Sequence, residues 1–512
     1  MPLPENNTPW PPPQLAAVTP KLEEWAAWWV GDPEGLRAAY QRPTGKPADR
    51  PSQYRGGIVG AAARLFWGRP QNDLTSARTQ LHVPIAADLC TASADLLFSE
   101  PPTFTVEGTS KATQDRLDAL TGDGLHATIA EAAETAAAMG GAYLRVTWDQ
   151  AVDPDGPFLT VVHSDRAAPE FAWGRLRAVT FWTLVRVDGQ RHVRHLERHE
   201  LRDGTGVVVH GLFEGTADNL GRAVPLTEHP ATAALADLVD ADSAISTESP
   251  GLGVVYVPNQ RPQRRWRNDP VGASLGRSDL DGVEHLMDAL DETYSSWMRD
   301  VRLGKARILA AASILEDGGP GRGLSFDADQ EVFTPVNMLQ RQGSERLPIE
   351  TVQFDIRYAE HAATAQQLLE AILRTAGYSA QTFGEGDGQV TATATEVNSR
   401  DQRSLLTRSR KARLWRPQLQ DAAVKLLAVD RAIFGTPNEE APVEVTWSPA
   451  VREAPLVLAQ TAQALRTARA ASTETLVRLQ NPTWDDEAVR REVAAIDAED
   501  AVPEPAAPSL FG

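Results

Sequence analysis

The chain has 512 residues, of which 42% are apolar and 23% charged, an ordinary globular composition in a chain too long for a single hydrophobic core. Its formal net charge of −19 argues against a surface that holds nucleic acid tightly, because such surfaces neutralise phosphates with clustered Lys and Arg. The sequence has no run of about 18 apolar residues and no basic segment followed by an apolar one at its start, so it predicts neither a membrane span nor an export signal. The one cysteine, Cys90, excludes a disulfide within the chain and is predicted to be a small core residue.

The first half of the chain begins with helical patterns. Residues 1–20 are Pro-rich and predict a mobile N-terminal arm, after which Trp25 and its neighbouring tryptophans predict a helix. Apolar residues at helical spacing predict a further helix over 81–98, and an Ala-rich segment predicts another over 125–139.

Consecutive strands are predicted to follow these helices. Short apolar and alternating segments are separated by turn residues at Gly189 and at Asp203-Gly204. The predicted strands cover residues 143–148, 158–163, 178–187, 192–201 and 207–213. The first half is therefore predicted to be an α+β region.

Long helical patterns dominate from residue 277 onward. The helix predicted over 277–302 has apolar residues at steps of three and four, which form one stripe. We expect this stripe to pack against another helix or another subunit through Leu286, Leu290, Tyr294 and Trp297. A small α/β insert is predicted over 303–350, followed by a second long helix over 351–377 that ends at Gly377.

A third long helix is predicted from Thr393, because Thr393 and Glu396 have the spacing of a capping box. It extends to about residue 432, and Pro417 is expected to kink or interrupt it by removing a backbone donor. A strand over 443–447 and two amphipathic helices, over 456–470 and 485–495, complete the pattern. The whole chain is thus predicted to be α+β and mainly helical.

A glycine-rich loop over 378–392 separates the second and third long helices. Its centre alternates glycine with acidic residues, and it contains no Lys or Arg. Glycines lower the free energy needed to change backbone conformation, and the absence of cations leaves nothing to hold phosphate. The loop residues of interest are Thr382, Phe383, Gly384, Glu385, Gly386, Asp387, Gly388 and Gln389.

One segment imitates the active site of a serine hydrolase. Gly272-Ala-Ser-Leu-Gly276 matches the G-x-S-x-G nucleophile elbow, which requires a strand directly before the serine and a helix directly after it. Asn-Asp-Pro at 268–270 precedes the motif instead of a buried strand. Ser274 is therefore interpreted as a loop residue, with a hydrolase as the weaker alternative.

Two other patterns imitate ligand sites. His195 and His199 are spaced as in a helical metal site, but the alternation around them predicts a strand, in which they lie about 13 Å apart and do not share one ion. Gly45-Lys46 is followed by Pro47, so the chain has no P-loop and any ATP-driven motor must be another protein. No metal, cofactor or catalytic residue is predicted.

A basic cluster in the third long helix offers two interpretations, contact with phosphates or subunit packing. At 100° per residue its side chains spread around the whole helix instead of lining one face, which favours subunit packing. The cluster consists of Arg400, Arg403, Arg408, Arg410, Lys411, Arg413 and Arg416.

The order of these elements resembles the portal proteins of long-tailed bacteriophages across nearly the whole chain. Three segments carry the resemblance: Leu-Phe-Ser-Glu-Pro-Pro at 97–102, Pro-Val-Gly-Ala-Ser-Leu-Gly-Arg-Ser-Asp-Leu at 270–280, and Thr-Ala-Thr-Glu-Val at 393–397 with Arg400. The resemblance implies a subunit with an N-terminal arm (1–20), a wing (21–276), a stem helix (277–302), a clip (303–350), a second stem helix (351–377), a tunnel loop (378–392), a long kinked wing helix with a strand (393–452), a crown (453–498) and a flexible tail (499–512).

The same resemblance implies a function and a set of partners. It implies a ring of about twelve copies at one capsid vertex, through which double-stranded DNA passes without sequence specificity during packaging, retention and ejection. The implied partners are the terminase motor, a head-tail adaptor, and the major capsid and scaffold proteins. The resemblance implies no contact with a membrane. The protein would then be in the virion, and in the host cytoplasm during assembly. Another capsid-associated ring or scaffold protein is the remaining alternative.

Overall fold

The computed structural model describes two units of the chain, each taken here by itself. The first unit is Met1–Gly386 with Arg403–Thr446, and the second is Asp387–Gln402 with Trp447–Gly512. The described residues are 3–32, 35–37, 81–108, 111–122, 124–303, 307–310, 316–317, 324–325, 349–352, 356–384, 394–447, 455–481, 484 and 486–500.

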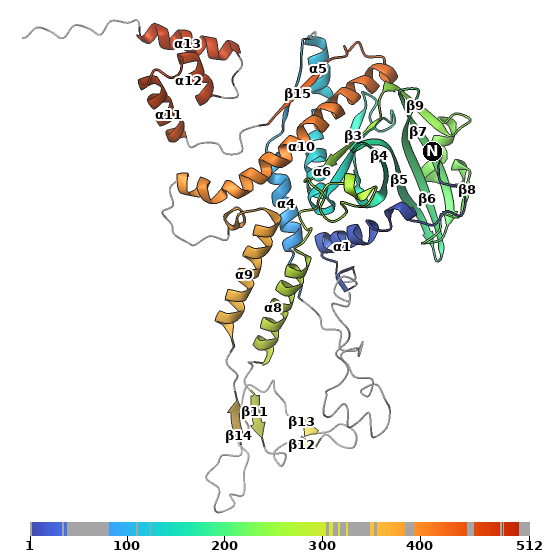
Figure 1. Ribbon diagram of the computed structural model, residues 1–512, viewed down its shortest axis with the longest axis vertical. Coiled ribbons are helices and arrows are strands. Elements are labelled where there is room, and N and C mark those ends of the chain that lie inside the picture. The colour runs from blue at the N-terminus through green and yellow to red at the C-terminus, as the bar shows by residue number, and fades with distance from the viewer. Residues whose placement is uncertain are drawn as a thin grey trace, which may run out of the picture. The chain divides into compact units, whose positions relative to one another are not determined.

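The first unit contains two larger antiparallel sheets (Figure 1). The smaller has the order β10-β2-β3, and the larger has the order β4-β5-β6-β7-β8, with β9 also paired to β7. The strands are β2 (Gly141–Thr147), β3 (Phe158–His163), β4 (Ala167–Ala172), β5 (Arg175–Asp188), β6 (Arg191–Arg202), β7 (Thr205–Gly215), β8 (Arg222–Val224), β9 (Ala244–Pro250) and β10 (Val254–Pro258).

Helices pack against these sheets and enclose the main core. Alanines of α6 allow close packing on β2, β3 and α4, and the tryptophans of α1 fill the space beside them. Cys90 of α4 is buried in this core, as predicted. The helices are α1 (Thr19–Val30), α4 (Ile85–Phe98), α5 (Lys111–Leu120), α6 (Leu125–Met139) and α7 (Pro230–Ala233). A separate two-stranded sheet pairs β1 (Thr103–Val106) with β15 (Val443–Thr446).

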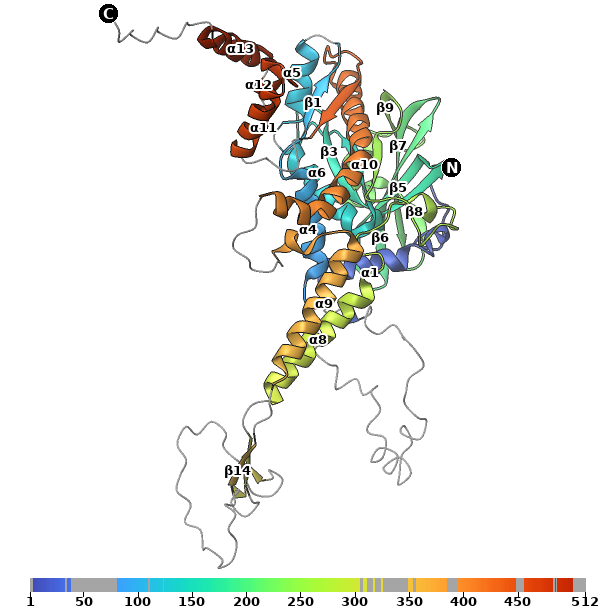
Figure 2. The same ribbon diagram turned by 60° about the vertical axis from the view of Figure 1, so that its left-hand side comes forward.

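Two long helices, α8 (Glu284–Leu303) and α9 (Tyr358–Ala376), lie side by side (Figure 2). Between them, the described residues form only short strands, with β11 paired to β14 and β12 paired to β13. These strands are β11 (Arg307–Ala310), β12 (Glu316–Asp317), β13 (Leu324–Ser325) and β14 (Ile349–Val352).

The helix α10 (Ala394–Phe434) is continuous through Pro417, so the proline does not interrupt it. Its residues from Arg403 onward belong to the first unit. The second unit contains α11 (Pro455–Thr467), α12 (Thr473–Gln480) and α13 (Asp486–Asp500). Among the described helices of both units, none combines the length and apolar character needed to cross a membrane.

The N-terminal segment differs from the mobile arm predicted for residues 1–20. Residues 3–20 are described, and they pack on the larger sheet through backbone hydrogen bonds such as Trp10 N–H to the Asp218 carbonyl, 2.8 Å. Trp10 is buried with its ring edge against Trp182, with centroids 5.1 Å apart. Proline content predicted mobility, but the buried tryptophan contributes apolar burial that ordering of the segment requires.

The predicted stem helices begin later than the sequence pattern indicates. Residues 277–283 precede α8, because Ser278 and Asp279 bond other segments and Gly282 has a φ of +95°. Residues 349–352 are in β14, so α9 begins only at Tyr358, and it ends at Gly377 with a left-handed φ of +101° as predicted. The fold class is therefore confirmed as a mixture of helices and sheets, with corrected helix starts.

Candidate functional site

The first set of predicted site residues lies on α8, facing α9. Leu290 is buried, and Leu286 and Tyr294 are partly buried against the same core. The Trp297 ring lies parallel to His361 of α9, with centroids 6.1 Å apart, and meets the Tyr358 ring at an angle of 63°. Leu290 is thus covered within one chain, without a second copy.

Part of the apolar surface of this helix pair stays exposed where α8 ends and α9 begins. On α8, Met298 and Val301 are 42% and 38% exposed, and beside α9 Ile356 and Tyr358 are 41% and 64% exposed. Single exposed apolar residues are ordinary, but a group of them on two adjacent helices marks a surface suited to another protein. Met298 and Val301 are the part of the predicted stripe that α9 leaves exposed.

A buried polar cluster lies where α8 and α9 meet α4 and α10. The Lys411 ammonium of α10 is 2.5 Å from Asp279 Oδ2 and donates to Ser93 Oγ at 2.6 Å. Tyr378 donates to Asp279 Oδ2 at 2.7 Å and accepts from Lys411 at 2.9 Å. The amides of Asn259 and Gln260 donate to Asp279 Oδ1 at 2.8 Å and 2.6 Å. We call these six residues the Asp279 hub.

Burial controls the electrostatics of the hub. It lowers the pKa of the Lys411 ammonium, and the Asp279 carboxylate opposes this by favouring the charged form. Burial also raises the pKa of the Tyr378 hydroxyl well above its usual value, and the negative charge of Asp279 acts in the same direction. The tyrosine is therefore a neutral donor, and Asp279 is the acceptor shared by donors from three other segments, at 259–260, 378 and 411.

The start of the predicted tunnel loop is fixed on α10. Ser404 Oγ accepts from the Ser379 N–H at 2.9 Å and lies 2.7 Å from Thr382 Oγ1, and Thr407 Oγ1 donates to the Gly377 carbonyl at 2.6 Å. Residues 380–383 form a short 3-10 helix in which the Phe383 ring meets Tyr378 edge-on. Gly384 ends this helix with a φ of +75°. The remaining loop residues of interest, Glu385, Gly386, Asp387, Gly388 and Gln389, lie outside the described residues.

The predicted basic cluster does not act as one surface. Lys411 is buried in the hub, and Arg408 donates to the Leu96 carbonyl at 2.6 Å. Arg403 is exposed but donates to the Arg374 carbonyl at 2.6 Å. Arg410, Arg413 and Arg416 are exposed, and the side chain of Arg400 lies outside the described residues. Helical spacing alone gave no sign that Lys411 is the member paired with Asp279.

Ser274 lacks the surroundings of a nucleophile elbow. It ends the 3-10 helix Gly272–Ser274, which no strand directly precedes, and α8 begins only at Glu284. Among the described residues, Ser274 enters hydrogen bonds only through its backbone, donating to the Val271 carbonyl and accepting from Arg261. The geometry agrees with the interpretation of a loop residue.

The histidines of β6 belong to a second buried polar cluster. His195 Nε2 is 3.1 Å from Nδ1 of His210 on β7, and the two rings are stacked with centroids 5.3 Å apart. Glu197 lies 2.6 Å from both His199 Nε2 and Arg145 Nη1. We call these five residues the histidine cluster. Sequence spacing identified His195 and His199 but missed His210, which strand pairing brings to them.

Across the part of the chain that the structure describes, no group of three or more metal-ligating side chains could hold an ion.

Burial disfavours the charged form of two imidazoles in the histidine cluster. Burial lowers the pKa of His210 to about 4, and the charges of His195, His199 and Arg145 act in the same direction against the opposing effect of Glu197. Burial likewise lowers the pKa of His195. The pKa of Glu197 lies far below its usual value despite burial, owing to hydrogen bonding by His199 and the charge of Arg145.

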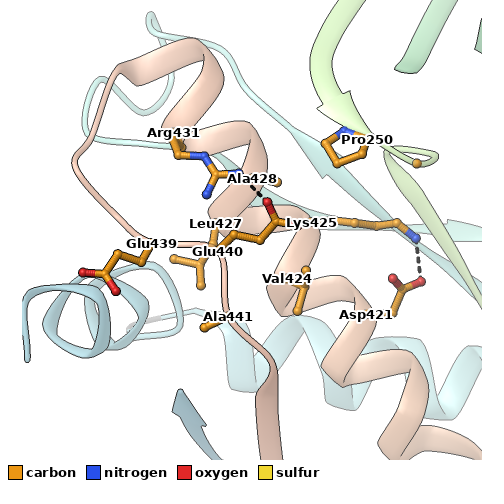
Figure 3. Close-up of a pocket in the computed structure, with 11 residues that line it drawn as sticks. Pro250, Asp421, Val424, Lys425, Leu427, Ala428, Arg431, Glu439, Glu440 and Ala441 are labelled. Carbon is orange, nitrogen blue, oxygen red and sulfur yellow. Dashed lines mark hydrogen bonds and ion pairs between the residues drawn. The ribbon is translucent and has the colours of Figure 1, made fainter. Parts of the chain in front are cut away.

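A cavity of about 300 Å³ lies along the C-terminal half of α10 (Figure 3). Its two cations already have carboxylate partners, since Lys425 is 2.5 Å from Asp421 and Arg431 is 3.4 Å from Glu440. No serine, cysteine or histidine lines it. Its lysine and arginine are taken up in these ion pairs, so the geometry gives no reason to assign a reaction to the cavity.

Comparison with known families matches residues 202–502 to the model described as "Phage portal protein, SPP1 Gp6-like". The chain belongs to this phage portal protein family. The match includes α8, α9, all of α10 and every hub residue except Ser93. Membership in this portal family identifies a ring-forming structural protein of a virion particle.

Solved structures and curated proteins add the following findings. The "Neck of empty GTA particle computed with C6 symmetry" is 13% identical, with a TM-score of 0.40, and the match covers 87% of this chain and 97% of that chain. The "Neck of native GTA particle computed with C12 symmetry" is 12% identical, with a TM-score of 0.39, and the match covers 89% of this chain and 99% of that chain. No curated protein matches the chain.

Proposed function

We propose that this chain is the subunit of a DNA-conducting portal ring at one capsid vertex. The ring has about twelve copies, serves genome packaging, retention and ejection, and binds the terminase motor and a head-tail adaptor. The observation that supports this most is the family match over residues 202–502, which includes both long helices and the segment that connects α9 to α10. The protein carries out no reaction in this proposal and acts by its shape and charge.

The proposed parts follow the order of the chain. Residues 21–276 form the wing, 277–302 and 351–377 the stem, and 303–350 the clip that contacts the adaptor and motor. The α8–α9 pair supports the stem, because two helices held by an apolar seam and the Trp297–His361 stack form a stiff unit. Residues 453–498 form the crown, and the major capsid and scaffold proteins contact the ring from outside.

The proposed DNA-facing element is the loop 378–392. Its start is held on α10 by Ser404 and Thr407, so a loop that begins there has a fixed base. The residues that follow include Glu385 and Asp387 and no Lys or Arg, so they attract no phosphate. A wall with this charge does not hold the DNA at any one position along the channel.

The assembly is tested by electron microscopy and light scattering of the purified protein. We expect negatively stained particles with a central hole and a mass of about twelve subunits at micromolar concentration and moderate salt. A monomer under these conditions contradicts the proposal. If the protein forms rings that do not lie at a vertex of purified particles, it is instead another ring or scaffold protein of the capsid.

The position of the loop is tested with Glu385→Lys and Asp387→Lys in one chain. The variant places two cations per subunit near the DNA, and counterion release makes each phosphate contact favourable at low salt. We expect less packaged DNA per particle at low salt and partial recovery at high salt, with ring assembly checked separately. Normal packaging at both salt concentrations shows that the loop does not face DNA.

A further inference from the structure

A group of arginines gathers on the surface next to the Asp279 hub. The segment 259–268 contains four arginines and no lysine, in a chain with 69 acidic and 50 basic residues. Arg265 is paired within the chain, with Asp281 at 2.6 Å and Glu284 at 3.5 Å. Arg261 and Arg264 are exposed and, among the described residues, form no ion pair.

Other segments of the chain bring two more arginines to the same place. The Arg277 backbone N–H donates to the Gln260 carbonyl at 2.8 Å, and its guanidinium donates to the Gln260 side chain. Arg410 precedes Lys411, whose ion pair with Asp279 brings this part of α10 to the residues that follow Arg277. We call Arg261, Arg264, Arg277 and Arg410 the arginine patch.

The four guanidiniums of the patch lack carboxylate partners. Within the described residues, none of them is within ion-pair distance of an Asp or Glu, and Arg261 instead donates to the Ser274 carbonyl at 2.9 Å. Burial lowers the pKa of Arg277, and the positive charges of Arg264 and Arg410 lower it further against the opposing Asp279 and Asp281. Like charges held together without a partner are unfavourable in the isolated subunit, so an anionic partner stabilises them.

We propose that the arginine patch binds carboxylates of a second copy of this chain in the ring, an inference that rests on the proposed ring. A closed ring joins two different faces of the same subunit, so a cationic patch on one face requires an acidic area on the other. The net charge of −19 supplies that acidic surface. Arginine without lysine is also the composition typical of protein interfaces, because the planar guanidinium binds carboxylates with two hydrogen bonds.

DNA is the other polyanion that an arginine patch could bind. Phosphate contacts from several arginines in every subunit would hold DNA in place at low salt, which opposes its passage through a portal. The patch also adjoins the hub through Gln260, which bonds both Arg277 and Asp279. A rigid support of this kind suits a permanent contact between subunits.

Charge reversal tests the contact directly. We expect Arg264→Glu with Arg410→Glu to raise the protein concentration at half assembly by at least about tenfold, because like charges then face each other across the interface. The measurement is mass by light scattering over a dilution series, with circular dichroism to confirm an unchanged helix content. The matched control is Arg186→Glu with Arg222→Glu, which changes the net charge equally at exposed arginines of β5 and β8.

The possible results of this comparison separate the two proposals. If the wild-type protein forms no ring, the proposed function fails and this inference fails with it. If the wild type forms rings and the reversal variant assembles as the control does, only this inference fails. If the reversal variant forms normal rings but loses binding to a 30-base-pair duplex that the wild type binds, the patch is a phosphate site and the inference is wrong.

A second experiment uses conservative substitutions that should leave folding unchanged. Arg264→Lys with Arg410→Lys keeps the charges and introduces amines that a carbodiimide joins to carboxylates in direct contact. Rings assembled from equal amounts of ¹⁵N-labelled and unlabelled variant are then cross-linked and digested. We expect peptides that join position 264 or position 410 of this variant to an Asp or Glu, with mixed isotope labels. Cross-links that carry only one label, or none at these positions, overturn the inference.

Discussion

The Asp279 hub and the histidine cluster are both buried and polar, but they are built from different parts of the sequence. The hub joins residues as far apart as Ser93 and Lys411, so it forms only after α4, α8, α9 and α10 have come together. Most of the histidine cluster lies on the adjacent strands β6 and β7, which a short turn connects. The hub is centred on the ion pair of Lys411 and Asp279, whereas in the histidine cluster burial lowers the pKa of His195 and His210. The first should therefore respond to the loss of a partner and the second to acid.

The largest effect is expected for Lys411→Met. Removing one member of a buried ion pair leaves the other charge without compensation, which lowers the free energy of unfolding by about 3–5 kcal/mol. Adding Asp279→Asn to this variant removes the remaining charge and should restore a part of the loss. The measurement is urea unfolding at one fixed protein concentration, because ring formation makes stability concentration-dependent. Equal stability of Lys411→Met and wild type would show that the pair contributes nothing.

Acid should weaken the histidine cluster over a defined pH range. The pKa of His210 is about 4 in the folded protein and about 6.5 in the unfolded chain, so the unfolded state binds the proton first as pH falls. The free energy of unfolding is then little affected above about pH 7 and falls by about 2 kcal/mol at pH 5 and about 3 kcal/mol near pH 4. The lowered pKa of His195 adds in the same direction.

His210→Asn isolates this contribution, since asparagine does not titrate. We expect the loss of stability between pH 7 and pH 5 to be smaller in the variant than in wild type, measured by urea unfolding at both pH values. Glu197 loses its favourable contacts only below its usual pKa, so it does not disturb this range. The titratable and charged groups near His210 are Glu197, His195, His199 and Arg145. His210 also lines a surface cavity beside β7, together with Glu5, Arg202 and Asp242. An identical pH dependence in both proteins would assign the effect elsewhere.

In the first half of the chain, local sequence rules predict the helices and turns better than the contacts between distant segments. The Ala-rich helix 125–139 is confirmed as α6, and the predicted turns at Gly189 and Asp203-Gly204 have positive φ values that favour these residues. Short strands such as β8 and β10 were missed, because three to five residues give too little periodicity. His210 was missed for another reason, since it meets His195 only through strand pairing.

The hub could not be predicted from the sequence at all. The sequence pattern predicts that Ser278 and Asp279 begin a helix, but Ser278 Oγ donates to the Ala138 carbonyl at 2.6 Å and Asp279 bonds Lys411. Lys411 was grouped with neighbouring arginines because charge in a sequence does not reveal burial. Lys411 is buried and its neighbour Arg410 is exposed, because a distant segment packs on one side of the helix and not on the other.

A smaller effect is expected where the hub continues toward the loop, at Ser404→Ala. The substitution removes the acceptor of the partly buried Ser379 N–H and the partner of Thr382 Oγ1, and loss of these bonds costs about 1 kcal/mol. Hydrogen exchange of the Ser379 and Thr382 amides should become faster, with little change in β5, β6 and β7. Ser409→Ala is the matched control, because within the described part of the chain its hydroxyl bonds only the Leu405 carbonyl of its own helix. Equal exchange in the two variants would show that Ser404 does not hold the loop base.

The smallest effect is expected for Ser274→Ala, a serine close to the hub that belongs to neither cluster. Its hydrogen bonds among the described residues use backbone atoms, which alanine retains, so the free energy of unfolding should change by less than about 0.5 kcal/mol. Ring assembly and packaged DNA per particle should also stay at the wild-type level, because the strand and helix of a nucleophile elbow are missing around it. An activity probe for serine hydrolases should label neither protein. If the variant forms normal rings that package no DNA, or if the probe labels wild type alone, Ser274 has a catalytic role. Its effect would then be chemical, unlike the effects on stability expected for the hub and the histidine cluster.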